Sequence, residues 1–323
     1  MPLRRIGYPP LLLGAALLAA YFETWLTGFL LALALTLPVL ALLLSLPGML
    51  GLRVRLRPES SGAVRGKAAF WRLETSARFR FSVARVDVHL RFINRMTGEE
   101  TAQRLRMRGI PNGSYLTLPA ETAHCGLLEA RVTRLRVTDC LGLFALRGRT
   151  PAPALLPVLP IPAEAEAPPP ERGGSPTLKP RPGGGPGEDY EIRPYRPGDP
   201  VKMIHWKLTC KRDETVLREV LEAERPEPVL ILDHFGPPDA LDGALDRLNA
   251  LSAALVEEGR PHTIRWLSQE DGRLHSYRVE GSRELKRCVA AILACPAPLE
   301  GVPTPEDGAA GGPCRRFGAE DES

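Results

Sequence analysis

The residues of this chain that could do chemistry lie in its second half. His205 and Cys210 are five residues apart, and an imidazole near a thiol can act as the base that activates a nucleophile. The sequence supplies no third residue to orient the histidine, so a thiol hydrolase using Cys210 is a minor alternative. The chain has six cysteines, Cys125, Cys140, Cys210, Cys288, Cys295 and Cys314. None forms a C-x-x-C pair, which indicates scattered reduced thiols and neither a metal framework nor disulfides.

The same region contains a turn surrounded by charged and aromatic residues. Pro197-Gly198-Asp199-Pro200 predicts a tight turn in which the Asp199 carboxylate accepts backbone N–H bonds. Arg193 can pair with a carboxylate such as Asp199 or Glu191, or stack on an aromatic ring. Tyr195 and Trp206 offer large apolar faces with polar edges, beside His205 and Lys207. We interpret this motif as a structural lock, a surface for binding a protein partner, or both; a catalytic role is the weakest reading.

The first 51 residues predict two transmembrane helices. No charge lies between Arg5 and Glu23, or between Glu23 and Arg53. Arginines flank both ends of the pair, and only Glu23 lies in the connecting loop, so the positive-inside rule predicts a hairpin with both ends in the cytoplasm. A cleaved signal peptide is the alternative, but a second, longer apolar segment follows at once. We therefore expect a multi-pass protein of the cell membrane, with the lipid bilayer as a partner and its soluble domains in the cytoplasm.

Charge is distributed unevenly along the chain. Residues 1–150 hold 21 basic and 9 acidic residues, whereas the remainder holds 21 basic and 29 acidic ones. A basic half next to a membrane anchor suits the anionic cytoplasmic leaflet. We expect no nucleic-acid partner, because the arginines between Arg53 and Arg149 alternate with apolar residues instead of clustering.

Residues 52–150 predict a basic, antiparallel β-sandwich. Apolar residues alternate over Leu52–Leu56, Phe79–Phe92 and Ala130–Val137, which is typical of strands with one buried face. The second run slips by one residue at Ala84–Arg85, and the third slips between Val132 and Leu135, so a β-bulge is expected in each. Residues 151–187 contain 12 prolines and six glycines, and this composition predicts a flexible linker.

Residues 188–295 predict the motif described above followed by an α/β domain. The short apolar run Pro228–Asp233 predicts a buried strand, and leucines at helical spacing predict a helix over Asp239–Glu258. Strands are expected at His262–Leu267 and Leu274–Val279, and a last helix begins at Ser282. The tail, 296–323, is rich in Gly, Pro and acidic residues, and is expected to be disordered.

These features together resemble the domain-of-unknown-function 58 family, membrane proteins associated with MoxR-type AAA+ ATPases. The residues that match the family motif are Gly187, Tyr190, Arg193, Tyr195, Gly198, Asp199, Ile204, His205, Trp206 and Lys207. The segment Asp139–Phe144 resembles the Asp-x-x-Gly-Leu-Phe step that closes the family's β-domain. This chain departs from the family where His205 replaces a frequent Asp, and where Cys210-Lys211 replaces a frequent Ala-Arg pair.

The resemblance implies a truncated α/β domain similar to a von Willebrand A domain. In that fold the first strand ends in Asp-x-Ser-x-Ser, whose oxygens help to hold Mg²⁺. Here the strand ends in Asp233, and Phe235 and Pro237 take the two serine positions. Because these side chains offer no oxygen, we expect no metal and no cofactor, with Asp233 as a vestigial ligand position. His234 would suit a softer metal, but a lone histidine is more often satisfied by a hydrogen bond.

The resemblance therefore implies a membrane-anchored, non-enzymatic scaffold or adaptor. We expect it to work with an AAA+ ATPase in cell-envelope or protein-complex assembly, through the motif from Arg193 to Lys207. A metal-dependent receptor of the von Willebrand A type is the principal alternative.

Overall fold

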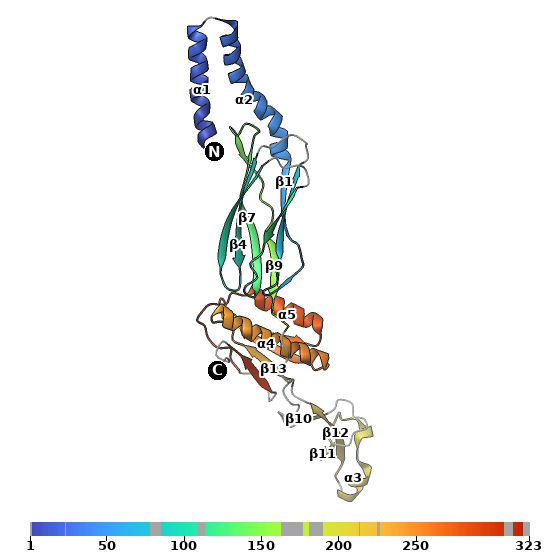
Figure 1. Ribbon diagram of the computed structural model, residues 1–323. Coiled ribbons are helices and arrows are strands. Elements are labelled where there is room, and N and C mark those ends of the chain that lie inside the picture. Colours follow the sequence, from blue (N-terminus) through green and yellow to red (C-terminus); the bar gives the residue numbers. More distant parts are fainter. Residues whose placement is uncertain are drawn as a thin grey trace. The chain divides into compact units, whose positions relative to one another are not determined.

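The computed structural model describes residues 2–22, 24–77, 85–108, 114–162, 177–180, 190–212, 214–224, 227–306 and 313–318 (Figure 1). The chain divides into two compact units. Unit 1 comprises Met1–Ile161 with Val289–Leu299, and unit 2 comprises Pro162–Cys288 with Glu300–Ser323. The predicted strand residues Phe79, Phe81 and Val83, and the motif residue Gly187, lie outside the described residues.

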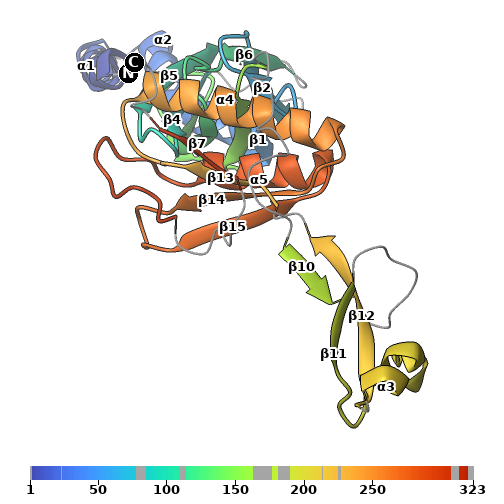
Figure 2. The same cartoon turned by 90° about the horizontal axis from the view of Figure 1, so that it is seen from below.

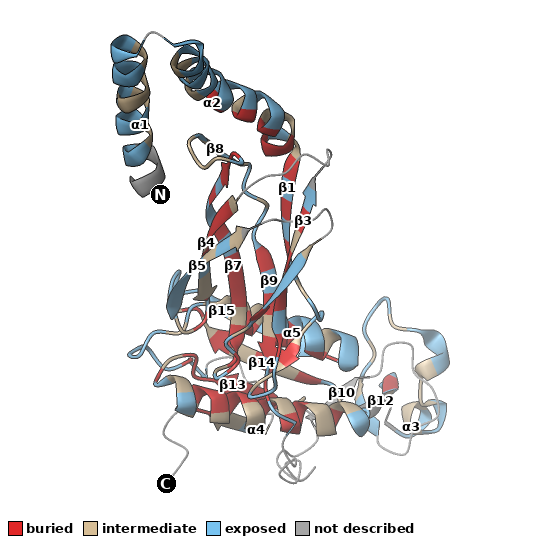
Figure 3. Cartoon of the chain, turned by 45° about the horizontal axis from the view of Figure 1, so that its top comes forward, coloured by how far each residue is buried: buried red, intermediate tan, exposed pale blue. Residues whose placement is uncertain are grey.

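Unit 1 begins with two apolar helices, α1 (Pro2–Tyr21) and α2 (Trp25–Gly51). Among the described residues, α2 alone is both long and apolar enough to cross a bilayer, with a mean hydropathy of 2.6. The apolar part of α1, Ile6–Tyr21, is shorter. Most leucines of α2 are exposed. Much of the ribbon of this helix is accordingly pale blue in Figure 3, with buried residues towards its C-terminal end. The structure thus provides one candidate membrane anchor near the N-terminus.

The rest of unit 1 consists mainly of two β-sheets. One sheet has the strand order β1-β3-β6, formed by β1 (Leu52–Pro58), β3 (Phe70–Ala77) and β6 (Tyr115–Pro119). The other has the order β2-β9-β7-β4-β5, with β8 also paired to β7; its strands are β2 (Ala63–Val64), β9 (Ala154–Leu159), β7 (Gly126–Thr138), β4 (Arg85–Asn94), β5 (Glu100–Arg108) and β8 (Ala145–Arg147). All pairings are antiparallel except that of β2 with β9. Both sheets contribute to one core, to which Trp71, Leu73, Val88 and Leu135 belong.

The alternation in β7 is interrupted where the sequence predicted a slip. His89 of β4 pairs with Arg134, whereas the next residue, Leu90, pairs with Val132. Thr133 is therefore the extra residue of a β-bulge, and its hydroxyl donates a hydrogen bond to the His89 carbonyl (3.2 Å). Because of this extra residue, Val132 and Leu135 both face the core. The predicted bulge in this strand is confirmed.

Part of the segment that we predicted to be a linker belongs to the sandwich. Residues Ala154–Leu159 form β9, which pairs with β7. Ala154, Leu156 and Val158 are buried and alternate with residues that are exposed or partly exposed, so the apolar period outweighs the high proline content of 151–187. The prediction of a flexible linker from residue 151 is thus corrected for these residues.

The first part of unit 2 is a three-stranded sheet with the order β10-β12-β11. Its strands are β10 (Thr177–Pro180), β11 (Tyr190–Pro194) and β12 (Val216–Glu224), and the connection from β11 to β12 carries η1 (Val201–Met203) and α3 (Trp206–Arg212). We call residues 190–224 the arm. Figure 2 shows its strands β11 and β12 side by side, with α3 next to β12.

The second part of unit 2 is a four-stranded sheet with the order β15-β14-β13-β16. Its strands are β13 (Val229–Leu232), β14 (His262–Leu267), β15 (Leu274–Val279) and β16 (Cys314–Phe317). Its helices are α4 (Pro238–Glu257) and the part of α5 (Ser282–Ala294) that ends at Cys288, since Val289 onward belongs to unit 1. Helix α4 lies over the sheet (Figure 2), and Ser252 on this helix hydrogen-bonds the His262 ring (2.7 Å). The predicted strands and helices of this region are therefore confirmed.

Strand β16 corrects the prediction of a disordered tail. Cys314–Phe317 pairs in parallel with β13, so that Ile231 lies opposite Arg316 and Leu232 lies opposite Phe317. Phe317 is buried, as is the β13 strand next to it. Local composition favours disorder here, but pairing with an apolar strand more than 80 residues earlier in the chain provides a partner that composition does not reveal.

Candidate functional site

An ion pair braces the motif of the arm. The Arg193 guanidinium contacts both carboxylate oxygens of Asp199, with Nη1 2.8 Å from Oδ2 and Nη2 2.9 Å from Oδ1. Its Nε also donates to Glu219 on β12 (3.3 Å). A two-pronged contact of this kind fixes both partners more firmly than a single hydrogen bond does. Arg193 thus ties the turn to the neighbouring strand, and Asp199 is one of the two carboxylates that the sequence offered it.

The turn itself is closed by Asp199. Its backbone N–H donates to the Arg196 carbonyl (3.0 Å), and its carboxylate accepts from the Arg196 N–H (2.9 Å). Gly198 precedes it with a φ of 108°, a conformation that favours glycine. The Arg193 guanidinium, helped by the Arg196 N–H, lowers the pKa of Asp199 from 3.8 to about 2.

His205 has a structural position at the start of α3. The ring Nδ1 of His205 accepts a hydrogen bond from the Leu208 N–H (3.2 Å). The backbone N–H of His205 donates to the Val216 carbonyl on β12 (2.9 Å). Thr209 connects the same elements, since its hydroxyl donates to the His205 carbonyl and accepts from the Val216 N–H. The histidine therefore caps a helix and joins it to a strand. In the described part of the chain, no hydrogen bond connects this ring with Cys210.

The remaining motif residues lie at the surface of the arm. Trp206 is 60% exposed, and Val201 is equally exposed. Tyr190 is also exposed, and the Arg218 guanidinium lies over its ring, 4.0 Å from the centroid. Lys207 is exposed next to Trp206, whereas Tyr195 is partly buried and donates its N–H to Thr215. Exposed aromatic residues on a braced support are typical of protein-binding surfaces.

Acid is expected to loosen the arm through protonation of Asp199. Because the pKa of Asp199 is lowered in the folded protein, its contribution to stability is fully present above pH 3.8 and is lost as the pH falls towards about 2. The amide protons of the turn and of α3 should then exchange faster over this range. Hydrogen exchange of the full chain measures this, and Asp199→Asn should remove the pH dependence. Equal exchange in the two proteins throughout would contradict the bracing role.

The end of β13 is organised around Asp233. The Arg316 guanidinium of β16 contacts both carboxylate oxygens through Nη1, at 2.9 and 2.8 Å, and the Thr304 N–H donates to Oδ1 (2.8 Å). Nη2 of Arg316 donates to the Thr304 carbonyl (3.1 Å) and to the Glu306 carboxylate (2.9 Å). Asp233 is buried, so these donors satisfy a carboxylate that has little access to water.

This arrangement does not fit a Mg²⁺ site. The two oxygens that a cation would need are held by a guanidinium, which already carries the positive charge. Phe235 and Pro237 supply no side-chain oxygen. A hard cation requires several oxygen ligands and would have to displace Arg316. Sequence reasoning missed Arg316 because the surrounding tail was predicted to lack structure.

His234, next to Asp233, is fully buried without a hydrogen bond. Neither ring nitrogen has a partner among the described residues, in contrast to the expectation that a hydrogen bond would satisfy it. Burial, and to a smaller extent the nearby His275, lowers the pKa of His234 from 6.5 to about 4. The ring is therefore neutral at pH 7 and contributes to packing.

Comparisons with known proteins give little guidance. No protein-family model matches the chain, and no curated protein matches it. Among solved structures, a cohesin module of a Clostridium perfringens family 33 glycoside hydrolase aligns at 12% identity over 33% of this chain and 95% of that one, with a TM-score of 0.24. A Pseudomonas fluorescens alkylpurine DNA glycosylase, AlkC, aligns at 8% identity over 45% of this chain and 42% of that one, with a TM-score of 0.22. At such scores, neither likeness bears on fold or function.

Proposed function

We propose that this protein is a membrane-anchored, non-enzymatic adaptor that binds a cytoplasmic protein partner through its arm. The observation that carries the proposal is the exposure of Trp206, Val201 and Tyr190 on a support braced by Arg193 and Asp199. Exposed tryptophan and tyrosine side chains lose contact with water on binding and are frequent anchors of interfaces. The ion pair holds their support in place, which reduces the entropy lost on association.

In this proposal α1 and α2 form a hairpin in the cell membrane. The apolar surface of α2 and the arginines at both ends of the hairpin support this arrangement. Both ends of the hairpin then lie in the cytoplasm, together with the sandwich and unit 2. A cytoplasmic AAA+ ATPase can reach the arm in this orientation.

The resemblance to the domain-of-unknown-function 58 family supports a MoxR-type AAA+ ATPase as the partner, in cell-envelope or protein-complex assembly. We propose that the four-stranded sheet of unit 2 corresponds to the degenerate von Willebrand A-like domain of that family. Its function would then be recognition without a metal, because Arg316 takes the charge-balancing position next to Asp233. A metal-dependent receptor is disfavoured by this ion pair.

The exposed tryptophan provides the test. Trp206→Ala is expected to weaken binding of a MoxR-type ATPase from the same cell by about thirtyfold, as for a residue worth about 2 kcal/mol in an interface. Binding is measured with the full chain in lipid nanodiscs, by surface plasmon resonance. Tyr115→Ala is the matched control, because Tyr115 is a similarly exposed aromatic residue (59%) on the sandwich. If the ATPase does not bind, or if both variants bind like the wild type, the proposal fails.

A further inference from the structure

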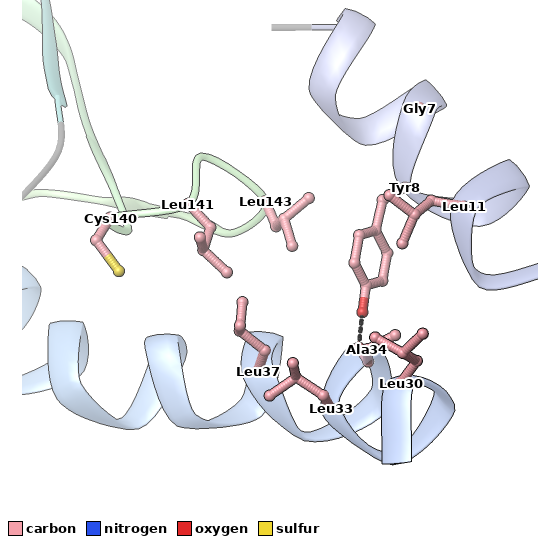
Figure 4. Close-up of a pocket in the computed structure, with 10 residues that line it drawn as sticks. All are labelled: Gly7, Tyr8, Leu11, Leu30, Leu33, Ala34, Leu37, Cys140, Leu141 and Leu143. Carbon is pink, nitrogen blue, oxygen red and sulfur yellow. Dashed lines mark hydrogen bonds between the residues drawn. The ribbon is translucent and has the colours of Figure 1, made fainter. Parts of the chain in front are cut away.

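An apolar pocket lies between α1, α2 and the loop that connects β7 to β8. Its volume is about 650 Å³, within the range of roughly 300–1,000 Å³ for small-molecule sites. The lining side chains are almost all aliphatic, and Figure 4 shows Leu141 and Leu143 of the loop facing Leu33 and Leu37 of α2. The one hydroxyl group in the lining, that of Tyr8, donates to the Ala34 carbonyl and is already satisfied. Such a pocket suits a hydrocarbon chain.

The loop wall of this pocket is fixed to α2 and to itself. The Cys140 N–H donates to the Ser45 hydroxyl of α2 (3.2 Å). Within the loop, the Asp139 carboxylate accepts from the Phe144 N–H (2.8 Å), and the Asp139 N–H donates to the Phe144 carbonyl (3.1 Å). Gly142, with a φ of 82°, allows the tight turn between them. The loop side of the pocket is therefore held in a fixed conformation by hydrogen bonds.

The position of this loop along α2 corresponds to a membrane surface. A bilayer core of about 30 Å is crossed by about 20 helical residues. Counted from Trp25, such a span ends near Leu44, and the loop is attached to the next residue, Ser45. The pocket thus extends from the surface into the hydrocarbon layer, and the strands that follow the loop begin at the level of the lipid headgroups.

Arginines gather on the sheet next to this loop. The strand register aligns Arg106, Asp87, Arg136 and Arg147 across β5, β4, β7 and β8, and we call this the arginine row. Its position follows from alternation itself: outward residues of neighbouring strands share one face, so arginines that are scattered in sequence are clustered in space. The arginines of the basic half are thus clustered in space, in contrast to the premise on which we expected no nucleic-acid partner.

Two members of the arginine row lack a carboxylate. The Asp87 carboxylate forms ion pairs with Nε of Arg85 (3.4 Å) and Nε of Arg106 (3.8 Å). Among the described residues, no carboxylate forms an ion pair with Arg136 or Arg147. These two exposed arginines lie directly opposite each other, and like charges in this position destabilise a sheet. An anion between them would remove this repulsion. Arg147 is four residues beyond Leu143, which lines the pocket.

We infer that the pocket and the arginine row together bind one anionic phospholipid. An acyl chain occupies the space lined by Leu33, Leu37 and Leu143, and the headgroup phosphate contacts Arg136 and Arg147. An apolar cavity at the membrane surface, and two neighbouring cations that form no ion pair among the described residues, match the two ends of this ligand. The inference relies on the membrane anchoring proposed above, but not on the protein partner. It adds a lipid-specific site to the anchor.

Native mass spectrometry of the full chain in an uncharged detergent tests the inference. We expect one phosphatidylglycerol molecule to bind at least about tenfold more tightly than phosphatidylcholine with the same acyl chains, since each nearby arginine favours an anionic headgroup. The double variant Arg136→Gln/Arg147→Gln should lose this preference. The matched control is Arg57→Gln/Arg72→Gln, which removes another directly opposed arginine pair, on the other sheet, and should keep it.

A second variant tests the pocket itself. Gly7 lines it, and a Cβ atom at this position meets no atom within 4 Å. We therefore expect Gly7→Leu to occupy part of the space and to weaken the binding of both lipids. Equal binding of the two lipids, or equal behaviour of the two double variants, would overturn the inference. Salt-sensitive binding of an oligonucleotide that depends on Arg136 and Arg147, without a preference for phosphatidylglycerol, would instead identify a nucleic-acid surface. If the chain did not enter membranes at all, the proposed anchoring would be contradicted. Loss of the lipid preference alone would contradict only the lipid site.

Discussion

Arg316→Met is expected to lower the stability of the four-stranded sheet by about 3 kcal/mol. The substitution leaves the Asp233 carboxylate buried without its charged partner, and an uncompensated buried charge is costly. We expect the lower end of the usual range, because the Arg316 side chain is 35% exposed and water can reach part of the site. Native-state hydrogen exchange of the full chain measures the effect at the Asp233 N–H, which donates to Phe317. A local readout is needed because a chain with two units need not unfold in one step.

The neighbouring arginine gives the control for this experiment. Arg315 lies in the same strand but is one residue out of phase, so its side chain leaves the opposite face of the sheet. Arg315→Met should cost less than about 1 kcal/mol. The double variant Arg316→Met/Asp233→Asn should recover part of the loss, since it removes both charges. If Arg316→Met cost no more than Arg315→Met, Asp233 would not depend on the ion pair.

Addition of Mg²⁺ to the wild-type protein shows whether Asp233 holds a cation. Mg²⁺ should leave the exchange rates of the wild-type sheet unchanged, because the guanidinium occupies both carboxylate oxygens. Stabilisation of the wild type by Mg²⁺ at millimolar concentration would contradict the absence of a metal site and would favour the receptor alternative.

Acidification from pH 6.5 to about 4 is expected to cost about 3 kcal/mol of stability through His234. The folded pKa is lower than that of the unfolded chain, so the unfolded state binds a proton first. The contribution of this residue is therefore fully present above pH 6.5 and is lost as the pH falls through this range. A buried neutral ring without hydrogen bonds gains nothing from protonation in the folded state. Exchange of the β13 amides as a function of pH measures the loss.

His234→Phe should flatten this pH dependence. It should also stabilise the protein at pH 7 by about 1–3 kcal/mol, since it removes buried polar atoms that have no partner. His205→Gln is the control, because that ring is partly exposed and belongs to the arm. An unchanged acid profile in His234→Phe would mean that another group, such as His262, whose pKa is also lowered by burial, controls the transition.

The features that could be predicted from the sequence are those set by neighbouring residues. Leucine spacing predicts α4, and the break between Val132 and Leu135 predicts the bulge at Thr133. Arg193 and Asp199 are six residues apart around one turn, so their pairing follows from local geometry. Each of these depends on the period of a helix or strand, or on the shape of a turn.

Features that depend on distant pairing could not be predicted in this way. Asp233 and Arg316 are 83 residues apart, and they meet only because β16 pairs in parallel with β13. Likewise, Arg136 and Arg147 form a charged surface only through the register of β7 and β8. A single sequence shows that each strand alternates, but not which strands lie together.

Photo-crosslinking from position 206 tests the adaptor function most directly. Trp206 is replaced by p-benzoylphenylalanine in the full chain, cells are irradiated, and the adducts are identified by mass spectrometry. We predict a crosslink to a MoxR-type AAA+ ATPase, and no such adduct when the same replacement is made at Tyr115 of the sandwich. Absence of the ATPase adduct at position 206, or equal amounts at both positions, would contradict binding of the ATPase by the arm.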